Sequence, residues 1–110
     1  MSREKGARFE RELSKMLREY GYEAERGCQH AGGKDSPDVK TNMPGIHIEA
    51  KNVERFSVWN AIAQSERDAG EDEMPVVMFK RNRSGVYVTL SFENFMKLFQ
   101  AYEAEIKNEE

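Results

Sequence analysis

Apolar residues recur three and four positions apart between residues 3 and 20, and charged residues occupy most of the positions between them. This spacing places the apolar side chains along one face of an α-helix. Gly21 follows directly, and glycine is a common residue at a helix end. Residues 3–20 are therefore expected to form an amphipathic helix. Its apolar face consists of Phe9, Leu13, Met16, Leu17 and Tyr20.

Shorter apolar segments separated by turn residues predict the β-strands. Residues 22–26 favour a short first strand. Residues 38–51 favour a hairpin-like pair of strands that turns at residues 41–45. Residues 76–81 are mostly apolar, which is typical of a central strand covered on both faces. After another turn, residues 86–90 favour a return strand.

Two more helices are expected to begin at serine residues, because a serine side chain can accept a hydrogen bond at a helix N-terminus. Ser57 precedes a helix that ends near Gly70, and Ser91 precedes the last helix. Trp59 lies off the apolar stripe of the first of these helices, so it is expected to cover a helix end or to contact another subunit. The last helix is expected to supply much of the core through Phe92, Phe95, Met96 and Phe99.

The elements follow the order α-β-β-β-α-β-β-α, which predicts an α/β protein with a mixed four- or five-stranded sheet flanked by helices. The 110 residues suit one domain, expected at residues 1–102, with an acidic tail at residues 103–110. No stretch approaches the roughly 20 apolar residues that cross a bilayer, and no secretory signal is recognisable. The single cysteine, Cys28, indicates a reducing compartment. We therefore expect a cytoplasmic protein with no membrane partner.

The net charge of −3 argues mildly against nucleic-acid binding. However, residues 101–110 carry four glutamates and one lysine, so the rest of the chain is balanced in charge. Several basic residues lie near the candidate site or in turns, among them Lys34, Lys80 and Arg81. A locally basic face therefore remains compatible with the composition.

The segment at residues 46–51 carries the most informative side chains. In a strand, Ile46, Ile48 and Ala50 point to one face, and Glu49 and Lys51 point to the other together with the intervening histidine. Charged groups beside a core must be paired or used for function.

Asp38 on the neighbouring strand brings a second carboxylate towards Glu49 and Lys51. Two carboxylates with an ammonium beside them suit Mg²⁺ and phosphodiester hydrolysis, because the ion takes oxygen ligands and offsets phosphate charge. Among carboxylates Lys51 is expected to stay protonated, which favours a positioning and electrostatic role.

Glu10 lies about 20° from Leu17 on the helical wheel, at the edge of the apolar face. It is interpreted in two ways: as a border glutamate paired with a basic neighbour, or as a third carboxylate directed at the metal site. The loop at residues 27–35 also has two interpretations: it contacts the substrate, or it simply connects two strands. His30 in this loop has no second histidine at ligand spacing, so a zinc site is not expected.

These residues resemble the PD-(D/E)XK nuclease superfamily. The pattern comprises residues 5–13, Lys-Gly-Ala-Arg-Phe-Glu-Arg-Glu-Leu, then Pro37-Asp38, and then Glu49-Ala50-Lys51. It is similar to the small archaeal and phage Holliday-junction resolvases. The resemblance implies a restriction-endonuclease-like fold and a Mg²⁺-dependent endodeoxyribonuclease, with Mn²⁺ able to substitute. It also implies that Glu10, Asp38 and Glu49 surround the metal and that Lys51 is the catalytic lysine.

The same resemblance implies a DNA partner, a branched one in the resolvases, and no nucleotide cofactor. A resolvase cuts two strands symmetrically, which implies a two-fold homodimer with Trp59 and the loops as the candidate interface. The candidate DNA-binding residues, from the resemblance and from the basic positions, are Arg11, Arg26, Lys34, Ser36, Gln64, Lys80 and Arg81.

Three alternatives stay open from the sequence. One is a different nuclease of the superfamily that cuts flaps, ends or specific sites, since fold resemblance supports chemistry better than substrate. Another is a non-catalytic DNA-binding module that kept the fold. The third is purely structural, with Glu49 and Lys51 forming a surface salt bridge.

Overall fold

The computed structural model describes residues 2–27, 37–55 and 57–109. The elements occur in the predicted order, with three helices and five strands in this part of the chain. They are α1 (Ser2–Glu19), β1 (Ala24–Arg26), β2 (Val39–Thr41), β3 (Ile46–Asn52), α2 (Val58–Asp68), β4 (Met74–Lys80), β5 (Tyr87–Thr89) and α3 (Phe92–Glu109).

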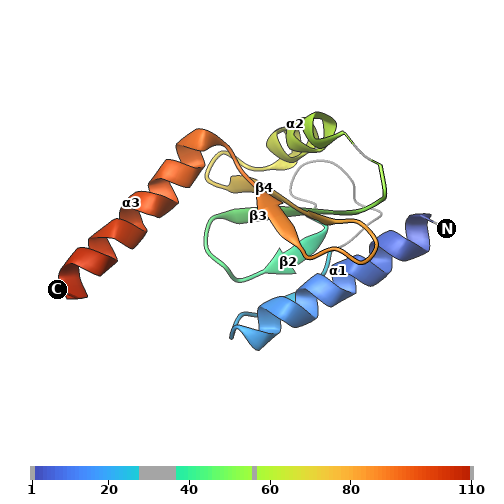
Figure 1. The fold of residues 1–110 in the computed structure, drawn as a ribbon, viewed down its shortest axis with the longest axis horizontal. Helices are drawn as coiled ribbons and strands as arrows, with labels where there is room; N and C mark the ends of the chain where they lie inside the picture. Colours follow the sequence, from blue (N-terminus) through green and yellow to red (C-terminus); the bar gives the residue numbers. More distant parts are fainter. Residues whose placement is uncertain (1, 28–36, 56, 110) are drawn as a thin grey trace.

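The five strands form one mixed sheet in the order β1-β2-β3-β4-β5. Neighbouring strands are antiparallel except β3 and β4, which run parallel over seven residues each. A parallel pair needs a crossover, and α2 supplies it. α1 packs on β1, β2 and β3, whereas α2 packs on β3 and β4 from the other side (Figure 1). This mixed sheet between helices confirms the restriction-endonuclease-like α/β fold.

The main core lies between α1 and the sheet. Its buried members include Phe9 and Leu13 of α1 and Ile48 and Ala50 of β3. The opposite face of β3 is also buried, but there the side chains are His47 and Glu49, beneath α2. The predicted alternation of β3 is therefore confirmed, and its polar face is enclosed by the crossover helix.

Both predicted helix starts are confirmed by their caps. The Ser57 hydroxyl accepts a hydrogen bond from the Asn60 amide at 3.1 Å, and the Ser91 hydroxyl accepts one from the Asn94 amide at 3.0 Å. Each bond satisfies one of the amides that a helix N-terminus leaves free.

The prediction that the last helix supplies core side chains is wrong. No residue of α3 is buried, and Phe92 is 78% exposed. The helix extends away from the sheet and runs on through the acidic residues to Glu109 (Figure 1). Periodicity identified its apolar face correctly, but periodicity does not say what covers that face. None of the helices in the described ranges is long and apolar enough to span a bilayer.

Candidate active site

Strand β3 carries two of the predicted site residues on the face beneath α2. The Glu49 side chain is 1% exposed, and Lys51, two residues further on, is half-buried. They share a face because side chains alternate along a strand. The strand thus holds a carboxylate at the interior and an ammonium nearer the surface.

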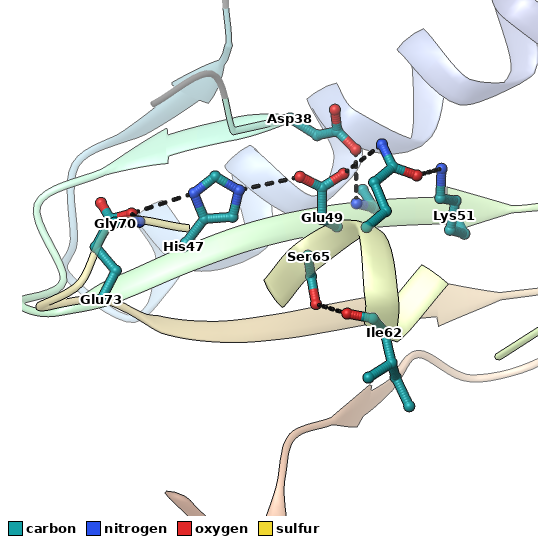
Figure 2. A network of polar contacts seen from close by, with 10 residues as sticks. Asp38, His47, Glu49, Lys51, Ile62, Ser65, Gly70 and Glu73 are labelled. Atoms are coloured by element: carbon teal, nitrogen blue, oxygen red, sulfur yellow. Dashed lines mark hydrogen bonds and ion pairs between the residues drawn. The ribbon is translucent and has the colours of Figure 1, made fainter. Parts of the chain in front are cut away.

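Asp38 lies immediately before β2 and is hydrogen-bonded to β3. Its backbone amide donates to the Ile48 carbonyl at 3.0 Å, and its Oδ2 accepts a hydrogen bond from the Ala50 amide at 2.8 Å. The carboxylate therefore lies next to Glu49, as Figure 2 shows. Pairing of neighbouring strands brings Asp38 next to Glu49, as predicted.

The surroundings raise the pKa of Asp38 from 3.8 to about 7. Burial is the largest cause, and the negative charges of Glu49 and Glu10 raise the pKa further. The hydrogen bond from Ala50 and the positive charge of Lys51 act in the opposite direction. The pKa of Asp38 therefore depends on Glu10, Glu49 and Lys51, which means that the four charged groups lie close enough to interact electrostatically.

Glu10 reaches this environment from α1, where it is 7% exposed. Its Oε1 accepts a hydrogen bond from Arg26 Nε at 2.7 Å. The basic neighbour expected for a border glutamate is therefore present, and it is Arg26 on β1. Glu10 also lies close enough to Asp38 to raise its pKa, so both interpretations of Glu10 have a structural counterpart.

Gln64 of α2 joins the two site residues of β3. Its Nε2 donates to Glu49 Oε1 at 3.3 Å, and its Oε1 accepts from Lys51 Nζ at 3.3 Å. A glutamine can do this because its amide has a donor end and an acceptor end. Gln64 therefore orients the carboxylate and the ammonium relative to each other.

A second polar contact to Glu49 comes from His47, which is fully buried. His47 Nε2 lies 3.0 Å from Glu49 Oε2, and Nδ1 lies 3.3 Å from Glu73 Oε1 without the geometry of a hydrogen bond (Figure 2). A carboxylate oxygen accepts, so a hydrogen bond from His47 to Glu49 needs the hydrogen on Nε2. This hydrogen bond is the largest cause that raises the pKa of His47, Glu73 adds to it, and burial opposes it.

The sequence pattern predicted no functional role for His47 or Glu73. Strand alternation already placed His47 on the face of Glu49, so the signal for His47 was present. For Glu73 there was none, because it lies in an acidic run that is typical of a solvated turn. Its Oε1 accepts a hydrogen bond from the Gly70 amide at 2.8 Å, which holds the carboxylate at the His47 ring.

No three histidine, cysteine or acidic side chains in the described residues are close enough to form a ready metal cluster. The donors nevertheless fit a hard divalent cation, which prefers carboxylate oxygens. Burial raises the pKa of Asp38 most, and the charges of Glu49 and Glu10 raise it further, so a bound cation would stabilise the ionised carboxylate. The residues that could hold it are Asp38, Glu49 and Glu10.

Comparison with protein-family models gives a match over residues 1–109, to a family described as "Phage putative PDDEXK endonuclease". The chain belongs to this family. The match includes Glu10, Asp38, Glu49 and Lys51, and it confirms the membership of the PD-(D/E)XK superfamily. A comparison with curated proteins found no match.

The other predicted contacts of this member of the PD-(D/E)XK superfamily lie in several places. Arg11 is exposed and lies 3.6 Å from Glu4, on the outer side of α1. Arg26 is engaged by Glu10. Lys34 and Ser36 lie outside the described residues, as does His30.

Lys80 and Arg81 line a surface cavity of about 540 Å³ at the carboxyl ends of β3 and β4. Arg55 and Tyr87 also line it, together with Val53, Glu54, Phe79 and Ser84. The cavity begins two residues beyond Lys51 along the chain. Three cations and an exposed tyrosine beside the site form a surface that suits a nucleic-acid backbone.

Gly27 is expected to tolerate no side chain. A Cβ built on it would lie 1.9 Å from the Pro37 carbonyl oxygen, and the Gly27 amide donates to the Asp38 carbonyl at 2.8 Å. Gly27→Ala should therefore lower the free energy of unfolding by about 1–3 kcal/mol and displace Asp38. Urea denaturation measures the first effect, and Gly6→Ala, which meets nothing within 4 Å, is the control. A Gly27→Ala protein as stable as that control would contradict the close approach.

His47→Leu is expected to weaken Mg²⁺ binding about 10- to 100-fold, because leucine cannot donate the hydrogen bond that holds the Glu49 carboxylate in one orientation. Isothermal titration calorimetry measures the affinity without any cleavage. Glu66→Leu, on the exposed side of α2, is the control. Unchanged Mg²⁺ affinity in His47→Leu would show that His47 only fills space.

Proposed function

We propose that this protein is a Mg²⁺-dependent endonuclease that hydrolyses DNA phosphodiester bonds and acts as a Holliday-junction resolvase. The observation that carries the chemistry is the convergence of Asp38, Glu49 and Lys51, with Asp38 hydrogen-bonded to β3 and its pKa raised by burial and, to a smaller extent, by the neighbouring carboxylates. The family match over residues 1–109 supports the nuclease class.

In this proposal Asp38, Glu49 and Glu10 hold the cation, and Mn²⁺ can replace Mg²⁺. The bound ion would supply a water of lowered pKa and offset the negative charge that develops on the phosphate. Arg26 neutralises part of the Glu10 charge and so keeps three carboxylates compatible in a partly buried place. Binding the cation requires that Asp38 lose its proton, since only the ionised carboxylate is a strong ligand.

Lys51 has the position of a group that contacts the scissile phosphate or the attacking water. Its ammonium is tied to Gln64, which is tied to Glu49, so the cation-binding carboxylate and the ammonium keep a defined separation. Such preorganised charge stabilises a transition state more than a freely moving side chain would. In this proposal Gln64 acts as a positioning residue for Glu49 and Lys51.

The DNA substrate is proposed to be a four-way junction. The support is the similarity of residues 5–13 to the small resolvases and the compact chain, which has room for one active site. Two symmetrical cuts then need two copies, so the proposed enzyme is a homodimer. DNA affinity is expected to fall steeply with salt, because phosphate contacts dominate.

The test is a cleavage assay on a four-way junction, a flap and linear duplex DNA of the same sequence, with Mg²⁺, with Mn²⁺ and with EDTA. Metal-dependent paired cuts in the junction, absent in Asp38→Asn, are the expected result. Metal-dependent cleavage of flaps, ends or specific sites instead would assign another nuclease activity. DNA binding without any metal-dependent cleavage would identify a non-catalytic module.

A further inference from the structure

Helix α3 presents an apolar stripe along its length. The spacings within this α3 stripe alternate between three and four residues, which keeps its members on one side of the helix. The α3 stripe consists of Phe92, Phe95, Phe99, Tyr102 and Ile106. Their exposures lie between 39% and 78%.

The stripe residues contact one another but are not enclosed. Phe95 and Phe99 have ring centroids 6.2 Å apart, and Phe99 and Tyr102 have centroids 6.0 Å apart. Within the described part of the chain, no residue of α3 is buried. Most helical stability in proteins comes from packing of an apolar face against another surface. The exposed stripe therefore calls for a partner surface.

We propose that the α3 stripe is the dimer interface of this protein and that its occupant is α3 of a second copy, packed antiparallel. The alternating three–four spacing is the pattern by which two helices pack side by side. In the antiparallel register, Phe99 lies opposite Tyr102 of the second copy, and Phe95 lies opposite Ile106. In the same register Phe92 lies opposite Glu109 and can pack on its aliphatic stem, so four of the five stripe residues face one another.

The area is sufficient for a dimer. Aromatic side chains bury about 150–250 Å² each, so five half-exposed stripe residues contribute on the order of 500 Å² per copy. Two copies then bury roughly 1,000 Å² before the flanking Met96 and Leu98 are counted, which reaches the lower size of specific interfaces. No other helix in the described ranges offers an exposed apolar stripe of this length.

Charge selects the antiparallel arrangement. With parallel helices, Glu109 would lie opposite Glu109 of the second copy. With antiparallel helices, Glu103 flanks Met96 of the second copy, and Glu105 flanks Leu98. The aliphatic stems of the glutamates can cover these side chains while the carboxylates stay in water. The acidic end of the helix is therefore compatible with a dimer only in this orientation.

The test is the molar mass measured by sedimentation velocity over about 1–100 μM protein, without DNA or metal. We expect a dimer for the wild type and an increase of the dissociation constant of at least about 100-fold for Phe95→Glu/Tyr102→Glu. The matched control is Gln100→Glu/Ala104→Glu, which adds the same charges to the opposite, exposed side of α3 and should stay dimeric. Circular dichroism checks that both variants keep their fold.

Three outcomes would overturn the inference: a wild-type monomer throughout this range, a Phe95→Glu/Tyr102→Glu variant that dimerises like its control, or dissociation by Trp59→Ala instead. Trp59 is 76% exposed on α2 and marks the other candidate surface. The inference rests on the homodimer of the proposed function, but the cleavage chemistry does not depend on it, because the stripe contains none of the site residues. The monomeric variant should still cut one strand at a time, whereas a failed proposed function would remove cleavage from the wild type.

Discussion

Lys51→Ala is expected to lower the rate of DNA cleavage by about 1,000-fold while changing DNA affinity less than about threefold. The Lys51 ammonium is held by Gln64 beside Glu49, where it can stabilise charge on the phosphate in the transition state. One ammonium among many phosphate contacts contributes little to overall binding. Single-turnover cleavage and metal-free DNA binding measure the two quantities separately.

The control for Lys51→Ala is Lys107→Ala, which removes the same charge from the exposed end of α3. This variant should cleave at the wild-type rate. Near-normal turnover of Lys51→Ala would refute the catalytic assignment. Equal loss of binding and cleavage would instead make Lys51 a general DNA contact.

Asp38→Asn is expected to reduce Mg²⁺ affinity and cleavage together, the latter by about 1,000-fold or more. An asparagine side-chain oxygen can still accept the hydrogen bond from the Ala50 amide, so the variant keeps the clamp and removes the charge. Calorimetric titration with Mg²⁺ and the junction-cleavage assay provide the two readouts. Asp72→Asn, in the exposed turn before β4, is the control and should change neither.

Asp38→Asn is also expected to change how the free energy of unfolding depends on pH. The pKa of Asp38 is about 7 in the folded protein against an ordinary value of 3.8, so the folded state holds this proton more tightly. Its contribution is therefore stabilising at low pH and is lost as the pH rises from about 4 to 7.

At pH 8 without metal, Asp38→Asn should be more stable than the wild type, by on the order of 2 kcal/mol. Mg²⁺ should stabilise only the wild type, and its affinity should rise as the pH passes 7, because it competes with the proton on Asp38. Thermal unfolding at pH 5 and pH 8, with and without Mg²⁺, measures these effects. Stability of the wild type that rises between pH 5 and pH 7, relative to Asp38→Asn, would contradict the raised pKa.

Local patterns were enough to predict the element order and the arrangement of β3. Alternation along residues 46–51 separates Ile48 from Glu49 whatever surrounds the strand, and the caps at Ser57 and Ser91 are bonds between residues three apart. The pairing of Asp38 with β3 also followed, because a short turn leaves adjacent strands few other arrangements.

Contacts between segments that are distant in the sequence could not be predicted from local patterns. Glu10 of α1 forms an ion pair with Arg26 of β1. Glu73 reaches His47 only because α2 returns the chain to β4, which runs parallel to β3. Neither pair has a characteristic spacing. The raised pKa of Asp38 likewise depends on burial and on carboxylates from two elements, β3 and α1.

The sequence by itself determined the element order, the polar face of β3 and the candidate residues for metal-assisted hydrolysis, because each follows from periodicity, from side-chain chemistry or from the family resemblance. Only the tertiary structure decided how the polar face is enclosed, which groups orient Glu49 and Lys51, and that the apolar face of α3 finds no cover on its own sheet. The physical reason is the same in each case. A periodic pattern defines which face of an element is apolar, whereas the partner of that face is set by the packing of the whole chain.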